Sequence, residues 1–294
     1  MDSLSFEAAF RAFVRTITAE SRLRLAPTPS GYLHAGNALN FILNWSAARY
    51  QPGAKLLLRI DDLDADRKRP EYVQDIFDTL LWLGIDWDEG PRNTADFEKN
   101  WSQTHRTASY FDALEKLKAS DLLFACAKSR RDLEPFGGRY PAAFRNQNLS
   151  LDQPGVAWRI RTPDGFPVPD FIVRRRDGIP AYQLASLVDD VHFGVSHVIR
   201  GEDLADSTLA QRFLARQLGW REFEQIQFLH HPLLRDSGGE KLSKSAGASS
   251  LRGWRETNRM PAELFSTVAQ MLNQGISHSF PAINDLLQAF KKSV

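Results

Sequence analysis

Apolar residues recur with two different spacings along the first 120 residues of the chain. Short continuous runs at 22–27 (RLRLAP) and 55–64 (KLLLRIDDLD) are typical of buried strands, and the second run ends in carboxylates. Helical spacing follows each run, at 36–50 and at 70–85, where Pro70 marks the start. Strands that alternate with helices at such short intervals predict a parallel α/β sheet. The same criteria predict further helices at 1–20, 102–119, 206–219 and from Pro261 onward.

The composition changes in the middle of the chain. From Asp121 to Val173 the sequence is rich in Pro, Gly and Arg, and two short pieces, VAWRIR at 156–161 and DFIVRRR at 170–176, look like strands. We therefore expect an inserted subdomain at 121–180. Alternation of strand and helix returns after it, over 182–201.

Bulk composition limits the class of protein without giving a function. The 294 residues are 43% hydrophobic and 25% charged, as in ordinary globular chains. The apolar runs FILNW and LLWLGI are too short for a membrane span, and the opening MDSLSFEAAFRAF carries an early acid, so we expect neither a membrane segment nor a signal peptide. A single cysteine, Cys126, excludes intrachain disulfides and favours the cytoplasm. With 37 basic and 36 acidic residues, a nucleic-acid partner would need a local basic surface.

The first candidate motif is TPSGYLHAGNA at 28–38. A glycine-bordered turn that leads into a helix N-terminus presents backbone N–H groups and a positive dipole end, which suit anionic phosphates. In this interpretation His34 donates a hydrogen bond to a phosphate oxygen. The alternative interpretation is a plain strand-to-helix corner, in which the glycines make the turn and His34 caps the helix or fills space.

The second candidate motif is GGEKLSKSAG at 238–247. Lys241 and Lys244 are three residues apart among Ser and Gly, and they could stabilise negative charge that develops on a triphosphate. Ser243 and Ser245 would then hold the loop by hydrogen bonds. The alternative is an exposed loop with solvated lysines.

Together and in this order, the two motifs resemble the two signature sequences of class I aminoacyl-tRNA synthetases. Four blocks of the chain resemble the glutamyl-tRNA synthetase family within that class, over about residues 22–250. These blocks are RLRLAPTPSGYLHAGNA, LLLRIDDLDADRKRPEYVQDIFDTLLWLGIDWDEGP, GIPAYQLASLVDDVHFGVSHVIRGEDL and KLSKS. A chain of this kind that ends at Val294, without the helical anticodon-binding module, is similar to the glutamyl-Q tRNA(Asp) synthetase family.

The resemblance implies an α/β fold: a Rossmann-like parallel-sheet catalytic domain with an inserted acceptor-binding-like subdomain, a short helical C-terminal stem and no anticodon-binding domain. We expect the two halves of the catalytic domain at 1–120 and 181–250, the second with the KLSKS loop. The inserted subdomain is then at 121–180 and the stem at 251–294.

The resemblance also implies a set of site residues. It assigns catalysis to His34, Lys241 and Lys244; ATP binding to Thr28, His34, Gly36, Asn37, Lys241, Ser243 and Lys244; and L-glutamate binding to Arg24, Ala26, Thr28, Asp61, Tyr182 and Arg200. Asn37 stands where many members have His, and Asp61 stands where glutamyl enzymes usually have Glu.

The chemistry of these side chains agrees with an amino-acid pocket. An arginine fork holds a carboxylate through two hydrogen bonds, and an acid at the carboxyl edge of a parallel strand lies where α/β ligands bind. The alternatives are an ordinary surface salt bridge for Arg24 and Arg200, and a half-buried core aromatic for Tyr182. Asp61 is one methylene shorter than Glu, and the adjacent Asp62 could take its role.

The expected cofactors are ATP and Mg²⁺, and zinc is not expected. The family often carries Cys-x-Cys and then Tyr-x-x-x-Cys as zinc ligands, which fall here on Cys126, Lys128, Tyr140 and Phe144. Lys128 and Phe144 cannot serve, and a structural zinc needs four donors. Packing of Phe144 is a possible substitute, with Cys126 as a small buried hydrophobe.

A basic cluster in the insertion could face tRNA. It comprises Arg174, Arg175 and Arg176 together with Lys128, Arg130, Arg131 and Arg145. The alternative is a solvated face without a partner.

The resemblance implies activation of L-glutamate to glutamyl-adenylate with ATP and without tRNA, followed by transfer to the queuosine base of tRNA(Asp). Three alternatives stay open. They are a glutamyl-tRNA synthetase lacking its anticodon domain, a catalytically silent tRNA-binding paralogue, and a small-molecule nucleotidylyltransferase. We expect a cytoplasmic monomer with no membrane partner.

Overall fold

The computed structural model describes residues 3–234, 250–273 and 280–293, which form two compact units. The first unit comprises Met1–Gln103, Val195–Asp203 and Ile226–Val294, and the second comprises Thr104–Gly194 and Leu204–Gln225. The chain therefore enters each unit more than once, so that residues far apart in the sequence share one core.

The strands of the first unit pair in parallel, as the sequence predicts. The pairs are β1 (Arg22–Leu25) with β2 (Lys55–Leu58), and β6 (His197–Gly201) with β7 (Gln227–His231). The Ser196 N–H donates to the Arg22 carbonyl at 3.0 Å and brings β6 beside β1. Because the two strands of each pair run the same way, their carboxyl ends lie at the same edge of that pair.

The second run of apolar residues forms a shorter strand than its sequence predicts. β2 ends at Leu58, although the expected strand extended to residue 64. Beyond it, the Arg59 N–H still donates to the Leu25 carbonyl at 2.8 Å and the Asp61 N–H to the Pro27 carbonyl at 2.9 Å. The backbone hydrogen bonding to the β1 segment therefore continues past β2, where Ile60 packs in the core and the charged residues form ion pairs.

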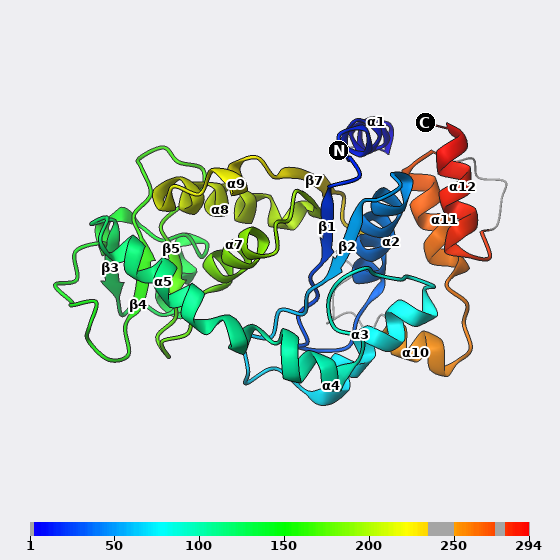
Figure 1. Ribbon diagram of the computed structural model, residues 1–294. Coiled ribbons are helices and arrows are strands. Elements are labelled where there is room, and N and C mark those ends of the chain that lie inside the picture. The colour runs from blue at the N-terminus through cyan, green and yellow to red at the C-terminus, as the bar shows by residue number, and fades with distance from the viewer. Residues whose placement is uncertain (1–2, 235–249, 274–279, 294) are drawn as a thin grey trace. The chain divides into compact units, whose positions relative to one another are not determined.

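Helices cover the sheet of the first unit (Figure 1). They are α1 (Ser3–Arg15), α2 (Ala35–Tyr50), α3 (Pro70–Trp82), α4 (Thr94–Asp96), α10 (Leu251–Glu256), α11 (Ala262–Met271) and α12 (Ile283–Ser293), with a π-helical turn at Phe97–Trp101. The predicted start at Pro70 is confirmed. The predicted helix at 1–20 ends earlier, at Arg15, and the one at 102–119 opens with a 3₁₀ turn at Gln103–Arg106 before α5 (Thr107–Lys118).

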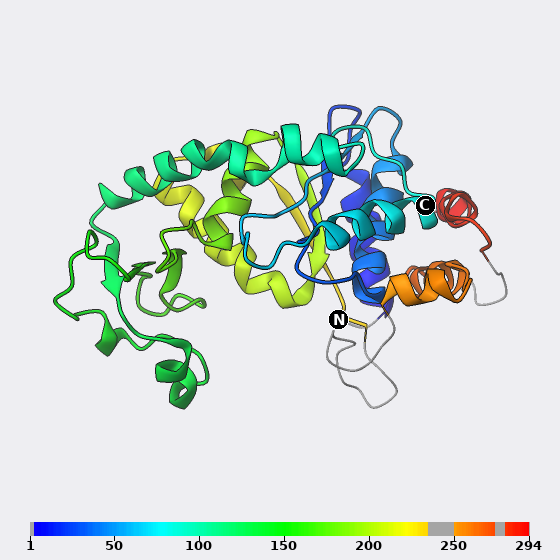
Figure 2. The same cartoon turned by 90° about the horizontal axis from the view of Figure 1, so that it is seen from below.

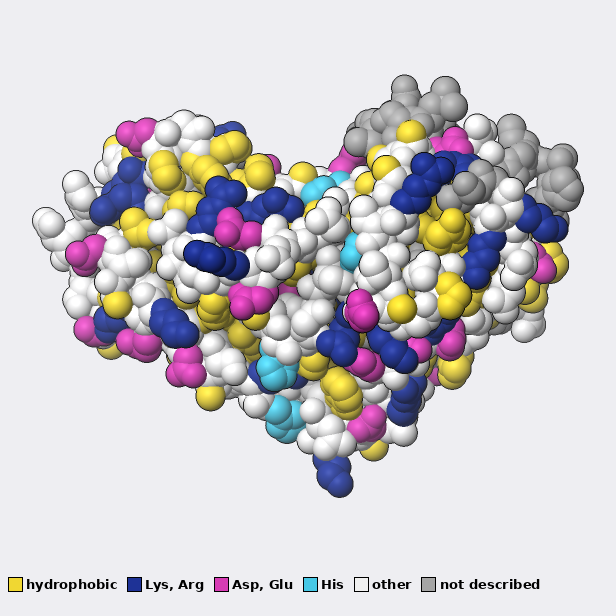
Figure 3. Space-filling model, turned by 45° about the horizontal axis from the view of Figure 1, so that its top comes forward, with side chains coloured by type: hydrophobic (Ala, Val, Ile, Leu, Met, Phe, Trp, Pro, Cys, Tyr) yellow, Lys and Arg dark blue, Asp and Glu magenta, His cyan; other side chains and the backbone are white. Residues whose placement is uncertain are grey.

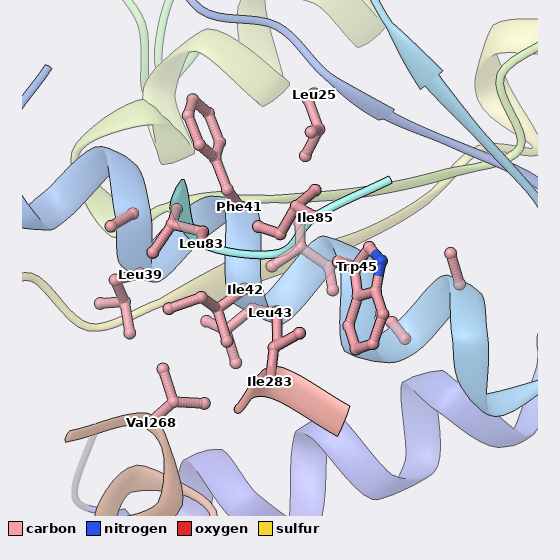
Figure 4. Packing of buried hydrophobic residues seen from close by; sticks show 14 of the residues in the cluster. Leu25, Leu39, Phe41, Ile42, Leu43, Trp45, Leu83, Ile85, Val268 and Ile283 are labelled. Carbon is pink, nitrogen blue, oxygen red and sulfur yellow. The ribbon is translucent and has the colours of Figure 1, made fainter. Parts of the chain in front are cut away.

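The core of the first unit surrounds α2. Its residues Ala38–Ala48 are buried, with only Asn40 partly exposed, which explains why its apolar positions run almost without interruption. Figure 4 shows Ile42 and Leu43 of α2 facing Val268 of α11 and Ile283 of α12. The C-terminal helices thus pack on the helix that follows β1, as Figures 1 and 2 also show.

The second unit combines an antiparallel sheet with helices. The strands are β3 (Leu123–Cys126), β4 (Ala157–Ile160) and β5 (Phe171–Arg174), in that order, and the helices after α5 are α6 (Arg130–Leu133), α7 (Tyr182–His192), α8 (Ala205–Leu218) and α9 (Arg221–Glu224). Short 3₁₀ turns lie at Glu134–Phe136, Ala142–Phe144 and Glu202–Leu204, the last of these in a segment shared with the first unit. The two strand-like pieces of the insertion are confirmed. Gly219, at φ 70°, ends α8 where the sequence predicts.

Candidate functional site

The corner between β1 and α2 is built around His34. This residue is the N-cap of α2, with φ −126° and ψ 172°. Its Nδ1 accepts a hydrogen bond from the Gly36 N–H at 3.1 Å, and the Asn37 side chain accepts one from the His34 N–H at 3.0 Å. This reciprocal arrangement is a capping box, so the capping role weighed as an alternative is present. Because Nδ1 is an acceptor, the neutral ring carries its hydrogen on Nε2 and can donate from there.

A cavity of about 180 Å³ lies at this corner. Residues 26–28, residues 30–33 and Asn37 line it, so three of the residues expected to bind ligand, Ala26, Thr28 and Asn37, border one space. The N-terminus of α2 supplies a partial positive charge beside it. Ligand pockets typically measure about 300–1,000 Å³, so this cavity matches part of a nucleotide rather than a whole one.

Gly36 is fitted closely to the cap. A Cβ added at this position would lie 3.0 Å from His34 Cε1 and 3.1 Å from its Nδ1. Any side chain here would therefore require the imidazole ring to shift by a few tenths of an ångström. The glycine of this motif is thus explained by the space that His34 needs.

Arg24 and Arg200 are both enclosed in protein. Arg24 is 4% exposed on β1 and Arg200 is 3% exposed on β6, each one residue before the end of its strand. The Arg200 guanidinium lies 4.9 Å from the centre of the Phe228 ring. Such burial does not fit the surface salt bridge considered as an alternative, because an exposed ion pair would leave the side chains in water.

Two asparagines of α2 hold that helix against the strand that carries Arg200. Asn40 and Asn44 both donate from Nδ2 to the Ile199 carbonyl, at 2.9 and 3.0 Å. Ile199 immediately precedes Arg200. The helix that His34 caps is therefore fixed to the backbone beside one of the predicted glutamate ligands.

Asp61 forms a buried ion pair with Arg59. Arg59 donates from Nε to Oδ1 at 2.7 Å and from Nη2 to Oδ2 at 3.0 Å, and the two residues are 2% and 7% exposed. Arg59 is not among the site residues expected from the sequence. Its signal was the spacing of two residues on an extended segment, which puts both side chains on one face. The Asp61 carboxylate is thus oriented by a guanidinium.

The Asp62 carboxylate accepts hydrogen bonds from residues other than Arg59. Its Oδ1 accepts from the Gln103 N–H at 2.8 Å, and its Oδ2 accepts from Ser102 Oγ at 2.7 Å and Lys68 Nζ at 3.1 Å. Burial tends to lower the pKa of Lys68, but hydrogen bonds to Glu98 and Asp62 outweigh it and the pKa is raised. Asp62 therefore anchors the start of the 102–106 turn, which does not favour it over Asp61 as a ligand.

Tyr182 belongs to the second unit, where it is the first residue of α7 and 43% exposed. That exposure does not match the half-buried core aromatic considered as an alternative. The expected residues Lys241, Ser243 and Lys244 lie outside the described residues. The chain after them is described from Ser250, and the Leu251 N–H donates to the Leu33 carbonyl at 2.8 Å.

Cys126 lies at the position of the expected zinc ligands, in a network of hydrogen bonds. Gln147 donates from Nε2 to Tyr140 Oη and to the Phe144 carbonyl, both at 2.8 Å, and accepts from the Ala127 N–H at 3.1 Å. Burial would raise the pKa of the Cys126 thiol, but hydrogen bonds with Tyr140, Lys128 and Gln147 outweigh it and the pKa is lowered.

The donor set around Cys126 fits zinc poorly. Lys128 Nζ lies 4.7 Å from the centre of the Phe144 ring, so an ammonium and a phenyl ring stand where two ligands would be needed. Within residues 3–234, 250–273 and 280–293 there is no group of three His, Cys, Asp or Glu side chains that could hold a metal ion. Whether the protein binds zinc stays a prediction.

Several members of the expected basic cluster have acidic or aromatic neighbours. Arg145 donates to Asp170 at 2.7 and 2.8 Å, Arg175 pairs with Asp177, and Arg174 lies over the Trp158 ring. Figure 3 likewise shows Lys and Arg interspersed with Asp and Glu on the face drawn. Arg130 and Arg131 are exposed on the short α6. The tRNA-facing role of this cluster stays a prediction.

Across the described part of the chain, no helix combines the length and apolar character that crossing a membrane requires.

The sequence matches the family described as tRNA synthetases class I (E and Q), catalytic domain, over residues 20–135 and 148–289. The unmatched stretch between them holds Tyr140, Phe144 and Gln147.

Two curated relatives show how the similarity is distributed. A glutamyl-Q tRNA(Asp) synthetase of Nitratidesulfovibrio vulgaris is 36% identical over 282 residues, covering 85% of this chain and 86% of the relative. A glutamate–tRNA ligase 2 of Gluconobacter oxydans is also 36% identical, over 281 residues, but the match covers only 61% of that protein.

A solved structure gives the same fold. The crystal structure of a glutamate–tRNA synthetase from Elizabethkingia anophelis aligns with a TM-score of 0.71 and 22% identity, over 92% of this chain and 66% of the other. The expected fold class, a class I synthetase catalytic domain with a parallel sheet, is therefore confirmed.

Proposed function

We propose a function from the premise that this chain belongs to the class I tRNA synthetases of the E and Q type, whose catalytic domain it matches over most of its length. The proposed reaction is ATP-dependent, tRNA-independent activation of L-glutamate to glutamyl-adenylate. The second step transfers glutamate to the queuosine base of tRNA(Asp). The relative with that name is matched over 86% of its own length, which supports this acceptor.

One structural observation carries the proposal. Two buried arginines, Arg24 and Arg200, lie near the carboxyl ends of β1 and β6, and the next helix after β1 begins at a capped N-terminus. Cations enclosed at that edge suit a small dicarboxylate, and a helix N-terminus suits a phosphate. This combination favours an amino acid activated by a nucleotide over a nucleotide alone.

In the proposed activation, an oxygen of the glutamate α-carboxylate attacks the α-phosphorus of ATP in line. The bond to the bridging oxygen breaks, and pyrophosphate leaves with that electron pair. No general base is required, since a carboxylate is ionised at neutral pH. His34 donates from Nε2 to an α-phosphate oxygen, and Lys241 and Lys244 stabilise the charge that moves to the leaving group.

The family typically uses Mg²⁺ with ATP, and Mg²⁺ would supply further charge neutralisation at the phosphates. Thr28, Gly36, Asn37 and Ser243 are proposed to border the nucleotide by backbone or side-chain contact.

The proposed amino-acid pocket uses opposite charges for the two ends of glutamate. Arg24 and Arg200 hold carboxylates, Asp61 accepts from the ammonium, and Tyr182 and Ala26 shape the pocket. Because Arg59 already holds both oxygens of Asp61, the ammonium would bind a carboxylate of fixed orientation. Asp61 then need not reorganise when glutamate binds.

The transfer step needs a surface for tRNA. We assign it to the inserted subdomain at 121–180, with the catalytic halves at 1–120 and 181–250 and the stem at 251–294. The exposed Arg130 and Arg131 of α6 are its basic candidates. We further propose a monomer that acts in the cytoplasm, without zinc; the single cysteine is consistent with a reducing compartment.

An ordinary glutamate–tRNA ligase activity is the second candidate. The relative from Gluconobacter oxydans has the same identity, 36%, although this chain spans 61% of its length. In that case the acceptor would be the terminal ribose of tRNA(Glu).

Exchange of labelled pyrophosphate into ATP tests the proposal. We expect glutamate-dependent exchange in the absence of tRNA, and transfer of labelled glutamate to tRNA(Asp) only when queuosine is present. Unmodified tRNA(Asp) and tRNA(Glu) are the matched controls. Charging of tRNA(Glu) would support the second candidate, and no exchange with any tRNA would support a silent paralogue.

A further inference from the structure

Leu33, the residue before His34, is held at both ends of its peptide. Its N–H donates to Asp75 Oδ2 on α3 at 2.9 Å, and its carbonyl accepts from the Leu251 N–H at the start of α10 at 2.8 Å. Leu33 itself is 3% exposed. The backbone that leads into the His34 cap is therefore fixed by α3 and α10, two elements far from it in the sequence.

Asp75 joins these two elements to each other. Its other oxygen, Oδ1, accepts from Arg255 Nη2 on α10 at 2.6 Å, and Arg255 Nη1 donates to Thr79 Oγ1 on α3, also at 2.6 Å. Asp75 is 2% exposed and Thr79 is fully buried. A buried carboxylate with a guanidinium on one oxygen and a backbone N–H on the other has little freedom to move.

A second set of contacts, made by Tyr32, joins the same two helices beside this network. Arg252 of α10 donates to Tyr32 Oη and lies 4.8 Å from the centre of its ring. Tyr32 packs edge-to-face on Tyr72 of α3, with ring centres 5.0 Å apart. Consecutive residues Tyr32 and Leu33 are thus both tied to α3 and α10.

The network connects a residue of the first candidate motif with the helix that follows the second motif along the chain. Leu33 precedes the first catalytic candidate, His34, and α10 follows the segment that contains Lys241 and Lys244. We propose that Asp75 and Arg255 are positioning residues for adenylate formation, which act through Leu33 to fix the His34 imidazole. This inference rests on the proposed function.

Positioning predicts a particular kinetic signature. A displaced imidazole weakens an interaction that is made most strongly in the transition state, so kcat falls while KM changes little. For Asp75→Asn, which turns an amide N–H₂ toward Arg255, we expect kcat of glutamate-dependent pyrophosphate exchange to fall about 10- to 100-fold. We expect KM for ATP and for glutamate to stay within about threefold.

A double-mutant cycle separates positioning from a general structural role. If Asp75 acts through His34, Asp75→Asn in a His34→Ala background should lower kcat by less than about twofold. A general structural defect would lower kcat by the same factor in both backgrounds. Arg255→Lys, which keeps a charge beside Asp75, should retain more activity than Arg255→Gln.

Arg259→Gln is the matched control. Arg259 lies four residues after Arg255 and pairs with the exposed Glu263, outside the network. We expect its kcat to stay within about twofold of wild type. Thermal unfolding of every variant checks that each is folded at the assay temperature. If Asp75→Asn does not fold, the same kinetic comparison is made with Arg255→Lys.

The outcomes distinguish this inference from the proposed function. A wild-type protein without glutamate-dependent exchange would overturn the proposed function itself. An active wild type together with a folded Asp75→Asn variant of wild-type kcat would overturn the positioning role alone. So would equal losses in the wild-type and His34→Ala backgrounds.

Discussion

Arg106 and Asp189 form a buried two-point ion pair that joins the 3₁₀ turn before α5 to α7. Arg106 donates from Nε to Oδ1 at 2.8 Å and from Nη2 to Oδ2 at 3.2 Å, and Asp189 is fully buried. Tyr110 Oη donates to the same Oδ1 at 2.8 Å. The pair sets the direction of α7, the helix that begins with Tyr182, within the second unit.

Removal of one partner should be costly for stability. We expect Arg106→Met to lower the free energy of unfolding by about 3–5 kcal/mol, because Asp189 would be left as a buried charge without its guanidinium. Urea unfolding followed by circular dichroism measures the loss. Arg216→Met, which removes an exposed pair with Glu224, is the control and should cost at most about 1 kcal/mol. Equal costs for the two variants would contradict the role given to the buried pair.

Asparagine at position 34 should separate capping from catalysis. Asn is among the best N-cap residues, so His34→Asn should keep α2 as stable as His34 does, whereas His34→Ala should cost about 1 kcal/mol. Both variants lack the Nε2 donor, and both should lower pyrophosphate exchange about 10²- to 10³-fold. Thermal unfolding and exchange assays on the two proteins check this. Full activity in His34→Asn would mean that the residue only caps the helix.

Gly90 should tolerate no side chain. Its φ is +107°, and an added Cβ would lie 2.2 Å from the Leu58 carbonyl oxygen at the end of β2. We expect Gly90→Ala to lower the free energy of unfolding by about 3 kcal/mol or more. Gly165→Ala also has a positive φ, at +79°, but open space around it, and should lose only about 1–2 kcal/mol. The comparison isolates the clash from the cost of a positive φ.

Buried His231 should make stability fall in mild acid. Its Nδ1 bonds the Pro232 carbonyl at 3.0 Å, and its Nε2 lies 3.3 Å from Asn40 Nδ2, which donates to it. Burial is the main cause that lowers its pKa below the ordinary 6.5, and the same holds for His197.

The direction in which stability changes with pH follows from proton binding by the folded and unfolded chains. Well above pH 6.5 the ring is neutral in both the folded and the unfolded chain, so its contribution to stability is complete. As pH falls below that value the unfolded chain takes up protons first, and stability declines until the lower pKa of the folded state is reached. Melting temperatures between pH 5 and 8 should therefore fall toward acid, and less steeply in His231→Gln. An unchanged slope in that variant would contradict this assignment.

The Cys126 region should be stable without metal. We expect substoichiometric zinc in protein purified without chelator, and no change in melting temperature on addition of EDTA. Gln147→Leu removes three hydrogen bonds and should destabilise the protein by about 1–3 kcal/mol. Tightly bound stoichiometric zinc, detected by elemental analysis, would contradict this expectation.

Local signals were sufficient for the elements that hold the site. Pro70 begins α3 as predicted, and the apolar runs at 22–27 and 55–64 contain β1 and β2. The ends of helices and strands were predicted less well, because they depend on contacts with residues distant in the sequence. The Asp62 carboxylate binds Ser102 and Gln103, and the expected helix at 102–119 therefore opens as a 3₁₀ turn.

Long-range contacts of the candidate site could not be read from the sequence. Nothing in the spacing of Leu33, Asp75 and Arg255 indicates that they meet, since each bond joins residues from different elements. The Arg59–Asp61 pair could have been predicted from the sequence, because its members share one face of an extended segment.

The contact between β1 and the residue before β6 also determines how this protein is made. Arg22 on β1 bonds Ser196, which is 174 residues further along the chain. Synthesis at about 5–20 residues per second separates the emergence of these two residues by about 10–35 seconds. Throughout that interval the β6-facing edge of β1 is without its native neighbour, and unpaired edges are where nascent chains associate wrongly. The risk of aggregation therefore falls mainly on the ribosome-bound chain rather than on the finished molecule.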